Sequence, residues 1–119
     1  MNYWKKYRQA KNELWERRAL WVPQTRAIIV YDGPTAYIFW LGGEADPTPK
    51  AVKVSNIALY EATKYALKGV LPKGCELSLV GKDELIEQRE LFAEALAEIG
   101  RDLPEPYYSR FVGLALQIT

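Results

Sequence analysis

Residues 26–41, RAIIVYDGPTAYIFWL, decide the fold of this 119-residue chain. Both halves of the stretch are rich in β-branched and aromatic side chains, which favour strands. Asp32-Gly33 lies between the halves and is a strong short-range turn signal. The stretch therefore predicts a β-hairpin whose antiparallel strands are residues 26–31 and 36–41.

The chain beyond the hairpin alternates between strand and helix signals. A loop with Gly42-Gly43 and two prolines comes first, which is typical of a plain connection. We expect further strands at residues 50–54, 75–80 and 110–118, and helices at residues 57–68 and 83–99. Short links predict antiparallel pairing of the first three strands, whereas intervening helices predict parallel pairing later. The expected fold is α/β, with a mixed five-stranded sheet in the order βββαβαβ.

A basic segment precedes this core. Residues 2–20 predict an additional N-terminal helix, which Pro23 ends. Residues 1–26 carry seven basic and two acidic side chains, whereas the remainder carries nine basic and 13 acidic ones. We therefore expect two parts, a basic aromatic helix at residues 1–22 and an α/β core at residues 23–119.

The composition excludes several chemistries. The chain has no histidine and one cysteine, Cys75. It cannot assemble a Ser-His or Cys-His catalytic pair, or a standard zinc site, from its own residues. The lone cysteine, the lack of a long apolar run and the polar start predict a cytoplasmic protein without a leader or a membrane span.

Three short motifs and the element order resemble the ribonuclease H-like family over residues 26–118. Tyr31-Asp32-Gly33 is similar to the family's Asp-Gly at the end of its first strand. Residues 56–62, NIALYEA, are similar to its helix start, Asn-x-Ala-Glu-Tyr-x-Ala. Asp83 follows the fourth strand, where the family has a further catalytic Asp. The resemblance implies a scaffold on which active members hold two divalent metal ions and cleave phosphodiesters.

The catalytic candidates that this resemblance implies are Asp32, Glu61 and Asp83, with Asp32 and Asp83 as the metal ligands. The family's Glu position falls on Leu59, however, and one alignment puts Lys82 at the Asp position. Asp32 also suits a hairpin turn, and Asp83 suits a helix N-cap. The resemblance therefore implies the scaffold more than the activity.

Aromatic and basic side chains are interleaved near the N-terminus. Aromatic rings stack on bases while cations neutralise phosphates, so this mixture suits nucleic acid. The alternative is that the rings pack on the sheet or on a partner subunit. The candidate residues for binding nucleic acid or a partner are Trp4, Lys5, Lys6, Arg8, Lys11, Trp15, Arg17 and Arg18.

Three functions stay open from the sequence. The first is a non-catalytic module that binds nucleic acid or a protein and needs no cofactor. The second is a nuclease that depends on magnesium or manganese. The third is a structural or regulatory protein that forms a homodimer through its N-terminal helix. None of the three involves a membrane.

Overall fold

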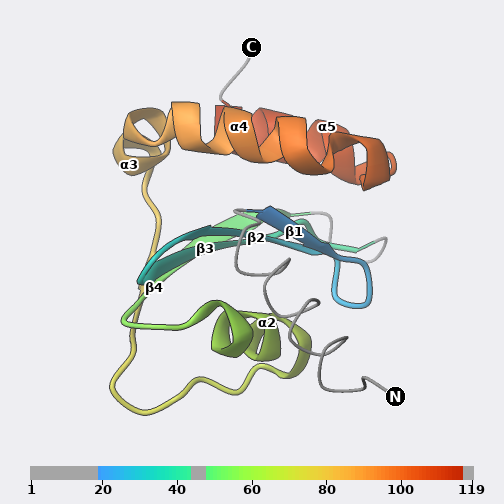
Figure 1. Ribbon diagram of the computed structural model, residues 1–119. Helices are drawn as coiled ribbons and strands as arrows, with labels where there is room; N and C mark the ends of the chain where they lie inside the picture. The colour runs from blue at the N-terminus through green and yellow to red at the C-terminus, as the bar shows by residue number, and fades with distance from the viewer. Residues whose placement is uncertain (1–18, 44–47, 117–119) are drawn as a thin grey trace, which may run out of the picture.

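A five-stranded antiparallel sheet lies between two layers of helices in the computed structural model, which describes residues 19–43 and 48–116 (Figure 1). The strands follow each other across the sheet in chain order: β1 (Ala19–Val22), β2 (Ala27–Asp32), β3 (Thr35–Trp40), β4 (Lys50–Ser55) and β5 (Glu76–Leu79). One layer is the single helix α2 (Leu59–Lys68). The other layer holds α3 (Lys82–Glu87), α4 (Arg89–Ile99), the 3-10 helix η1 (Gly100–Asp102), α5 (Tyr107–Phe111) and the π-helix η2 (Val112–Leu116).

The predicted hairpin is confirmed as β2 and β3. Its register runs from the pair Ala27 and Trp40 to the pair Asp32 and Thr35. Because successive residues of a strand point to opposite faces, each strand contributes to two cores. The turn signal and the alternating apolar residues therefore position the centre of the sheet.

The expected mixed sheet is wrong, because all four strand pairs are antiparallel. The error lies in the connection between β4 and β5. α2 runs back along the sheet, but residues 69–75 then return, so β5 starts where β4 ends, with Ser55 opposite Glu76. Cys75 Sγ donates a hydrogen bond to the carbonyl oxygen of Asn56 at 3.2 Å, which ties the two strand ends together. A helix followed by an extended return makes a reversal and not a crossover.

The end of the predicted N-terminal helix is also corrected. Ala19 and Leu20 belong to β1, where they pair with Val30 and Ile29 of β2. These residues complete the edge of the sheet, so burial against the core overrides the helical pattern read from the sequence. The rest of the predicted helix, residues 2–18, lies outside the described residues.

The strand predicted at residues 110–118 is wrong over its described part, which is helical. Glu105 starts this helical segment, since its carboxylate accepts hydrogen bonds from the backbone N–H and the hydroxyl of Ser109. Phe111, Ala115 and Leu116 are buried, a spacing that suits one face of a helix. Contact with the core therefore overrides the β propensity of this segment.

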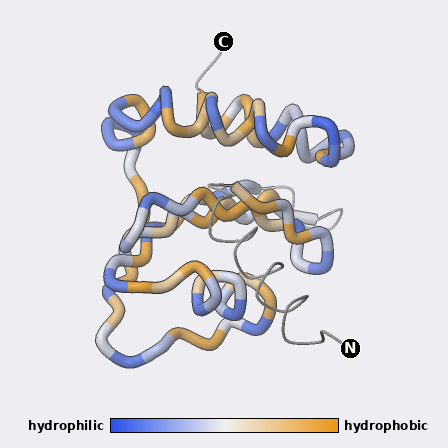
Figure 2. The backbone as a smooth tube through the Cα atoms, viewed as in Figure 1, coloured by the Kyte–Doolittle hydropathy of each residue, from blue (hydrophilic) through white to orange (hydrophobic). Residues whose placement is uncertain are grey.

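Two hydrophobic cores flank the sheet, and the orange segments of Figure 2 follow the strands between the helix layers. On the α4 side, the ring of Phe39 packs edge-on against Phe92 and Phe111, with centroids 4.9 and 5.0 Å apart. On the α2 side, small residues such as Ala62 and Ala66 let the helix approach the strands closely. No helix within residues 19–43 and 48–116 combines the length and the apolar character needed to cross a membrane.

Candidate functional site

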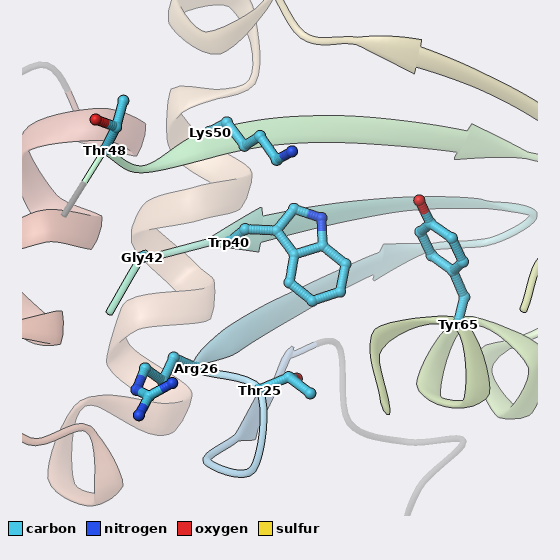
Figure 3. A pocket seen from close by; sticks show the side chains of 7 residues that line it. All are labelled: Thr25, Arg26, Trp40, Gly42, Thr48, Lys50 and Tyr65. Carbon is cyan, nitrogen blue, oxygen red and sulfur yellow. The ribbon is translucent and has the colours of Figure 1, made fainter. Parts of the chain in front are cut away.

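A pocket of about 410 Å³ opens at one end of the sheet, next to α2 (Figure 3). Four separate segments build it: the β1–β2 turn, the end of β3, the start of β4 and the second half of α2. Its described lining residues are Thr25, Arg26, Trp40, Gly42, Thr48, Lys50 and Tyr65. The volume falls in the range of small-ligand sites.

Trp40 and Lys50 reach the pocket through strand alternation. They are cross-strand partners, and they extend the α2-facing row that Ile38 and Val52 begin. The Trp40 ring is half-buried and meets Tyr65 nearly edge-on, with centroids 6.1 Å apart. Tyr65 thus fixes the orientation of the indole while the indole still lines the pocket.

Arg26 lines the pocket from the β1–β2 turn, and its guanidinium points away from Trp40 and Lys50 (Figure 3). Its φ of 55° lies in the left-handed region, which a non-glycine residue rarely adopts. Its Nε donates a hydrogen bond to the hydroxyl of Tyr107 at 3.0 Å, and its carbonyl oxygen accepts one from the N–H of Leu41. The Nη groups carry the remaining guanidinium donors, which suit a bidentate anion such as phosphate.

Contacts around the pocket hold its walls in place. The hydroxyl of Thr25 donates to the carbonyl oxygen of Ala66 at 2.8 Å, which joins the β1–β2 turn to α2. The Arg110 guanidinium lies 5.5 Å from the Tyr107 ring centroid and donates to the carbonyl oxygen of Leu41 at 3.0 Å. The pocket is therefore built on hydrogen-bonded elements from both sides of the sheet.

The chemistry of the pocket is cationic and aromatic. Arg26 and Lys50 are basic, Trp40 and Tyr65 are aromatic, and none of the described lining residues is acidic. Rings of this kind stack on bases, and cations of this kind bind phosphates. The described lining can hold a planar anionic ligand without charge repulsion.

Among the three predicted catalytic carboxylates, Glu61 lies on the opposite side of the sheet from Asp83. Glu61 lies on α2, where its Oε1 accepts a hydrogen bond from the backbone N–H of Ala58 at 3.3 Å. Asp83 lies in the first turn of α3, which is on the other side of the sheet. Asp32 is exposed at the end of β2. The described residues contain no group of three or more Asp, Glu, Cys or His side chains that could hold a metal ion.

Glu61 instead acts within its own neighbourhood. Burial of the Tyr31 side chain raises the pKa of Tyr31, and the charge of Glu61 raises it further by a smaller amount. The Tyr31 hydroxyl donates to the carbonyl oxygen of Ile57 at 2.8 Å. This contact fastens the segment before α2 to β2, which is a structural role.

A second polar group lies between the sheet and α3. Lys53 Nζ and Glu84 Oε1 are 2.6 Å apart, and this contact raises the pKa of Lys53. Burial, with a smaller contribution from Glu84, raises the pKa of Tyr37, which is the cross-strand partner of Lys53. The group joins α3 to β4, and we assign it a structural role.

The predicted N-terminal binding residues lie outside the described part of the chain. The predicted binding role therefore stays a prediction for all eight of these residues, which are Trp4, Lys5, Lys6, Arg8, Lys11, Trp15, Arg17 and Arg18. Sequence reasoning missed the pocket residues Arg26, Trp40, Lys50 and Tyr65. The available signal was the alternation that puts Trp40 and Lys50 on one face, on either side of the Gly42-Gly43 loop.

The chain matches no protein-family model, no curated protein and no solved structure. The ribonuclease H-like assignment thus stays a prediction, and the antiparallel sheet differs from the mixed sheet that it implies.

Proposed function

We propose that this protein is a non-catalytic module that binds single-stranded nucleic acid in the pocket beside α2. The observation that carries the proposal is that Trp40, Tyr65, Arg26 and Lys50 all line one opening. These residues come from four segments of the chain, so the mixture of rings and cations arises from the fold and not from local composition.

Trp40 is the residue that stacks on a base in this proposal. Its ring lines the pocket and is held by Tyr65, so little conformational entropy is lost when a base covers it. Stacking of one base on an aromatic side chain contributes about 1–3 kcal/mol. Any base has an aromatic face, so this contact favours nucleic acid without selecting a sequence.

Arg26 and Lys50 are the phosphate contacts. The Arg26 guanidinium can bind two phosphate oxygens, whereas the Lys50 ammonium acts as a point charge. Each contact with a single strand releases counterions, and the slope of log K against log salt changes by about 0.7 per contact. The basic residues at positions 1–18 would add attraction of the same kind.

The proposal assigns no catalysis to the protein. Two-metal cleavage needs carboxylates that share metal ions a few ångströms apart. Glu61 and Asp83 are instead carried by helices on opposite faces of the sheet. This separation supports binding over cleavage.

A fluorescence-anisotropy titration with labelled oligo-dT and oligo-rU tests the proposal. Strands of about 12 nucleotides fall within the site sizes of small single-strand-binding domains. The titration compares wild type with Trp40→Ala, Lys50→Ala and Arg26→Gly between about 50 and 200 mM salt. Arg26→Gly removes the guanidinium and its hydrogen bond to Tyr107, and it relieves the left-handed backbone. The circular-dichroism spectrum of this variant therefore has to match that of wild type before its effect on binding is read.

We expect Trp40→Ala to weaken binding about five- to 150-fold, in line with the loss of one stacked base. Lys50→Ala and Arg26→Gly should each reduce the salt slope by about 0.7. Arg101→Ala is the matched control, because Arg101 is an exposed cation of η1 in the other helix layer. This variant should bind like wild type.

Wild type that does not bind at about 50 mM salt would sink the proposal. Competition by a mononucleotide as effective as that by the oligonucleotide would identify a nucleotide pocket instead. Incubation of the labelled strands with magnesium or manganese checks the non-catalytic part. Cleavage that disappears in Asp32→Asn and Asp83→Asn would show that the protein is a nuclease.

A further inference from the structure

β5 forms one edge of the sheet and is exposed along its whole length. Within residues 19–43 and 48–116, its strand partner is β4 alone. Val80, which follows β5, still donates its backbone N–H to the carbonyl oxygen of Ala51. Backbone groups of successive residues point to opposite sides of a strand, so those of Leu79 and Leu77 point away from β4. Such an edge is a template for pairing with another strand.

The same two residues carry apolar side chains. Leu77 and Leu79 are 48% and 78% exposed, an unusual position for leucine beside a core. They lie opposite Val54 and Val52 of β4, so they extend the α2-facing side of the sheet. An edge strand is commonly protected by a charge or a proline, but the outward-pointing positions of β5 hold leucine.

We infer that a second copy of this chain pairs with β5 across a two-fold axis at Ser78. The antiparallel register places Leu77 opposite Leu79 of the partner, and it places Leu79 opposite Leu77 of the partner. Residues whose backbone groups face the partner then form hydrogen-bonded pairs, which gives about four new backbone hydrogen bonds. The axis is perpendicular to the sheet, so all four leucines meet on the α2-facing side.

The leucine pattern favours a second copy as the occupant. Leu77 and Leu79 are equally far from the axis, so the register sets leucine against leucine in both pairs. The chain itself thus supplies a strand with the same length and the same apolar pattern.

Mass measurement of the full chain by sedimentation equilibrium is the first test. Wild type should approach twice 13.6 kDa as its concentration rises. Leu79→Lys places a charge at the paired edge and should weaken association at least about tenfold. Leu67→Lys is the matched control, because Leu67 is an exposed leucine of α2 and not of the edge. It should associate like wild type.

Leu79→Pro sharpens this test. Proline removes the N–H that faces the partner, while the N–H groups that bond to β4 stay intact. It should abolish association and keep the circular-dichroism spectrum of wild type. A wild-type chain that stays monomeric, or an association that Leu79→Lys leaves unchanged, would overturn the inference.

Cysteine cross-linking tests the register. Ser78 lies on the axis, where the two copies of a non-hydrogen-bonded pair have Cα atoms about 4.5 Å apart, within disulfide range. In a Cys75→Ser background, Ser78→Cys should give a disulfide dimer on mild oxidation, and Glu76→Cys should not. The reverse pattern would refute the proposed register. None of these measurements involves nucleic acid, so they stand or fall separately from the proposed binding function.

Discussion

The two faces of the sheet are covered unequally. On one face α3, α4, α5 and η2 bury a core that includes three phenylalanines in edge-to-face contact. On the other face α2 has ten residues, and beyond it Trp40 lines a pocket while Leu77 and Leu79 stay exposed. We expect the fully covered face to supply most of the stability. Both proposed interaction surfaces belong to the face that one helix covers in part.

The largest predicted effect is on the covered face. Phe92 is fully buried and contacts the rings of Phe39 and Tyr37. Phe92→Ala should reduce the free energy of unfolding by about 3–5 kcal/mol, because it leaves a large cavity. Urea denaturation followed by circular dichroism measures the loss. A loss under about 1.5 kcal/mol would mean that this core repacks easily.

Trp40→Ala makes the comparable change on the partly covered face. It removes a larger side chain, but Trp40 is only half-buried, so we expect a loss of about 1–2 kcal/mol. The same urea experiment gives the value. A loss as large as that of Phe92→Ala would show that the two faces contribute equally, which would contradict the comparison.

A pair of glycine substitutions probes the two helix layers with a smaller effect. Gly69 ends α2 with a φ of 72°, so Gly69→Ala should cost about 1 kcal/mol through backbone strain alone. Gly113 lies in η2 and has open space around its Cα, so Gly113→Ala should be neutral or stabilising by up to about 1 kcal/mol. Thermal melts distinguish the two outcomes. Equal shifts of Tm would contradict this prediction.

The smallest predicted effect is a loss of stability in alkali. The pKa values of Tyr31, Tyr37 and Lys53 are all raised in the folded protein, above their usual 10.0, 10.0 and 10.5. The folded state then holds these protons more tightly than the unfolded state does. The resulting stability is present below about pH 10 and is lost as the pH rises through the folded-state values.

Tyrosine variants separate the two faces in this experiment. Tyr31 belongs to the α2 side and Tyr37 to the α4 side. Tyr31→Phe and Tyr37→Phe should each flatten the fall of Tm between about pH 9 and 11, since each removes one titrating group. A fall in Tm that is identical to wild type in both variants would exclude the tyrosines as its source.

Local signals predicted the centre of the fold correctly. The β2–β3 hairpin, β4, α2 and β5 follow from turn residues and side-chain patterns that act over a few positions. The direction of β5 could not be predicted from these local signals, because it depends on how far residues 69–75 extend back along α2. The strand predicted at residues 110–118 was wrong for a similar reason. Its β-prone side chains are buried against α4 as a helix, a contact that no local pattern specifies.

The candidate site could not be predicted from the sequence, and the reason is geometric. Arg26, Trp40, Lys50 and Tyr65 share no motif and span 40 positions of the chain. Their meeting depends on the strand register and on where α2 ends. Glu61 and Asp83 lie on opposite faces of the sheet for the same kind of reason, since the side on which each helix packs is not specified by spacing in the sequence.

The left-handed conformation of Arg26 has a consequence for engineering. Glycine would adopt this φ of 55° without steric cost, so a search for stabilising substitutions would select position 26 early. That substitution would remove one of the two basic side chains among the described lining residues of the pocket. Selection for thermal tolerance alone should therefore favour a more stable protein, and under the proposed function that protein would bind nucleic acid more weakly.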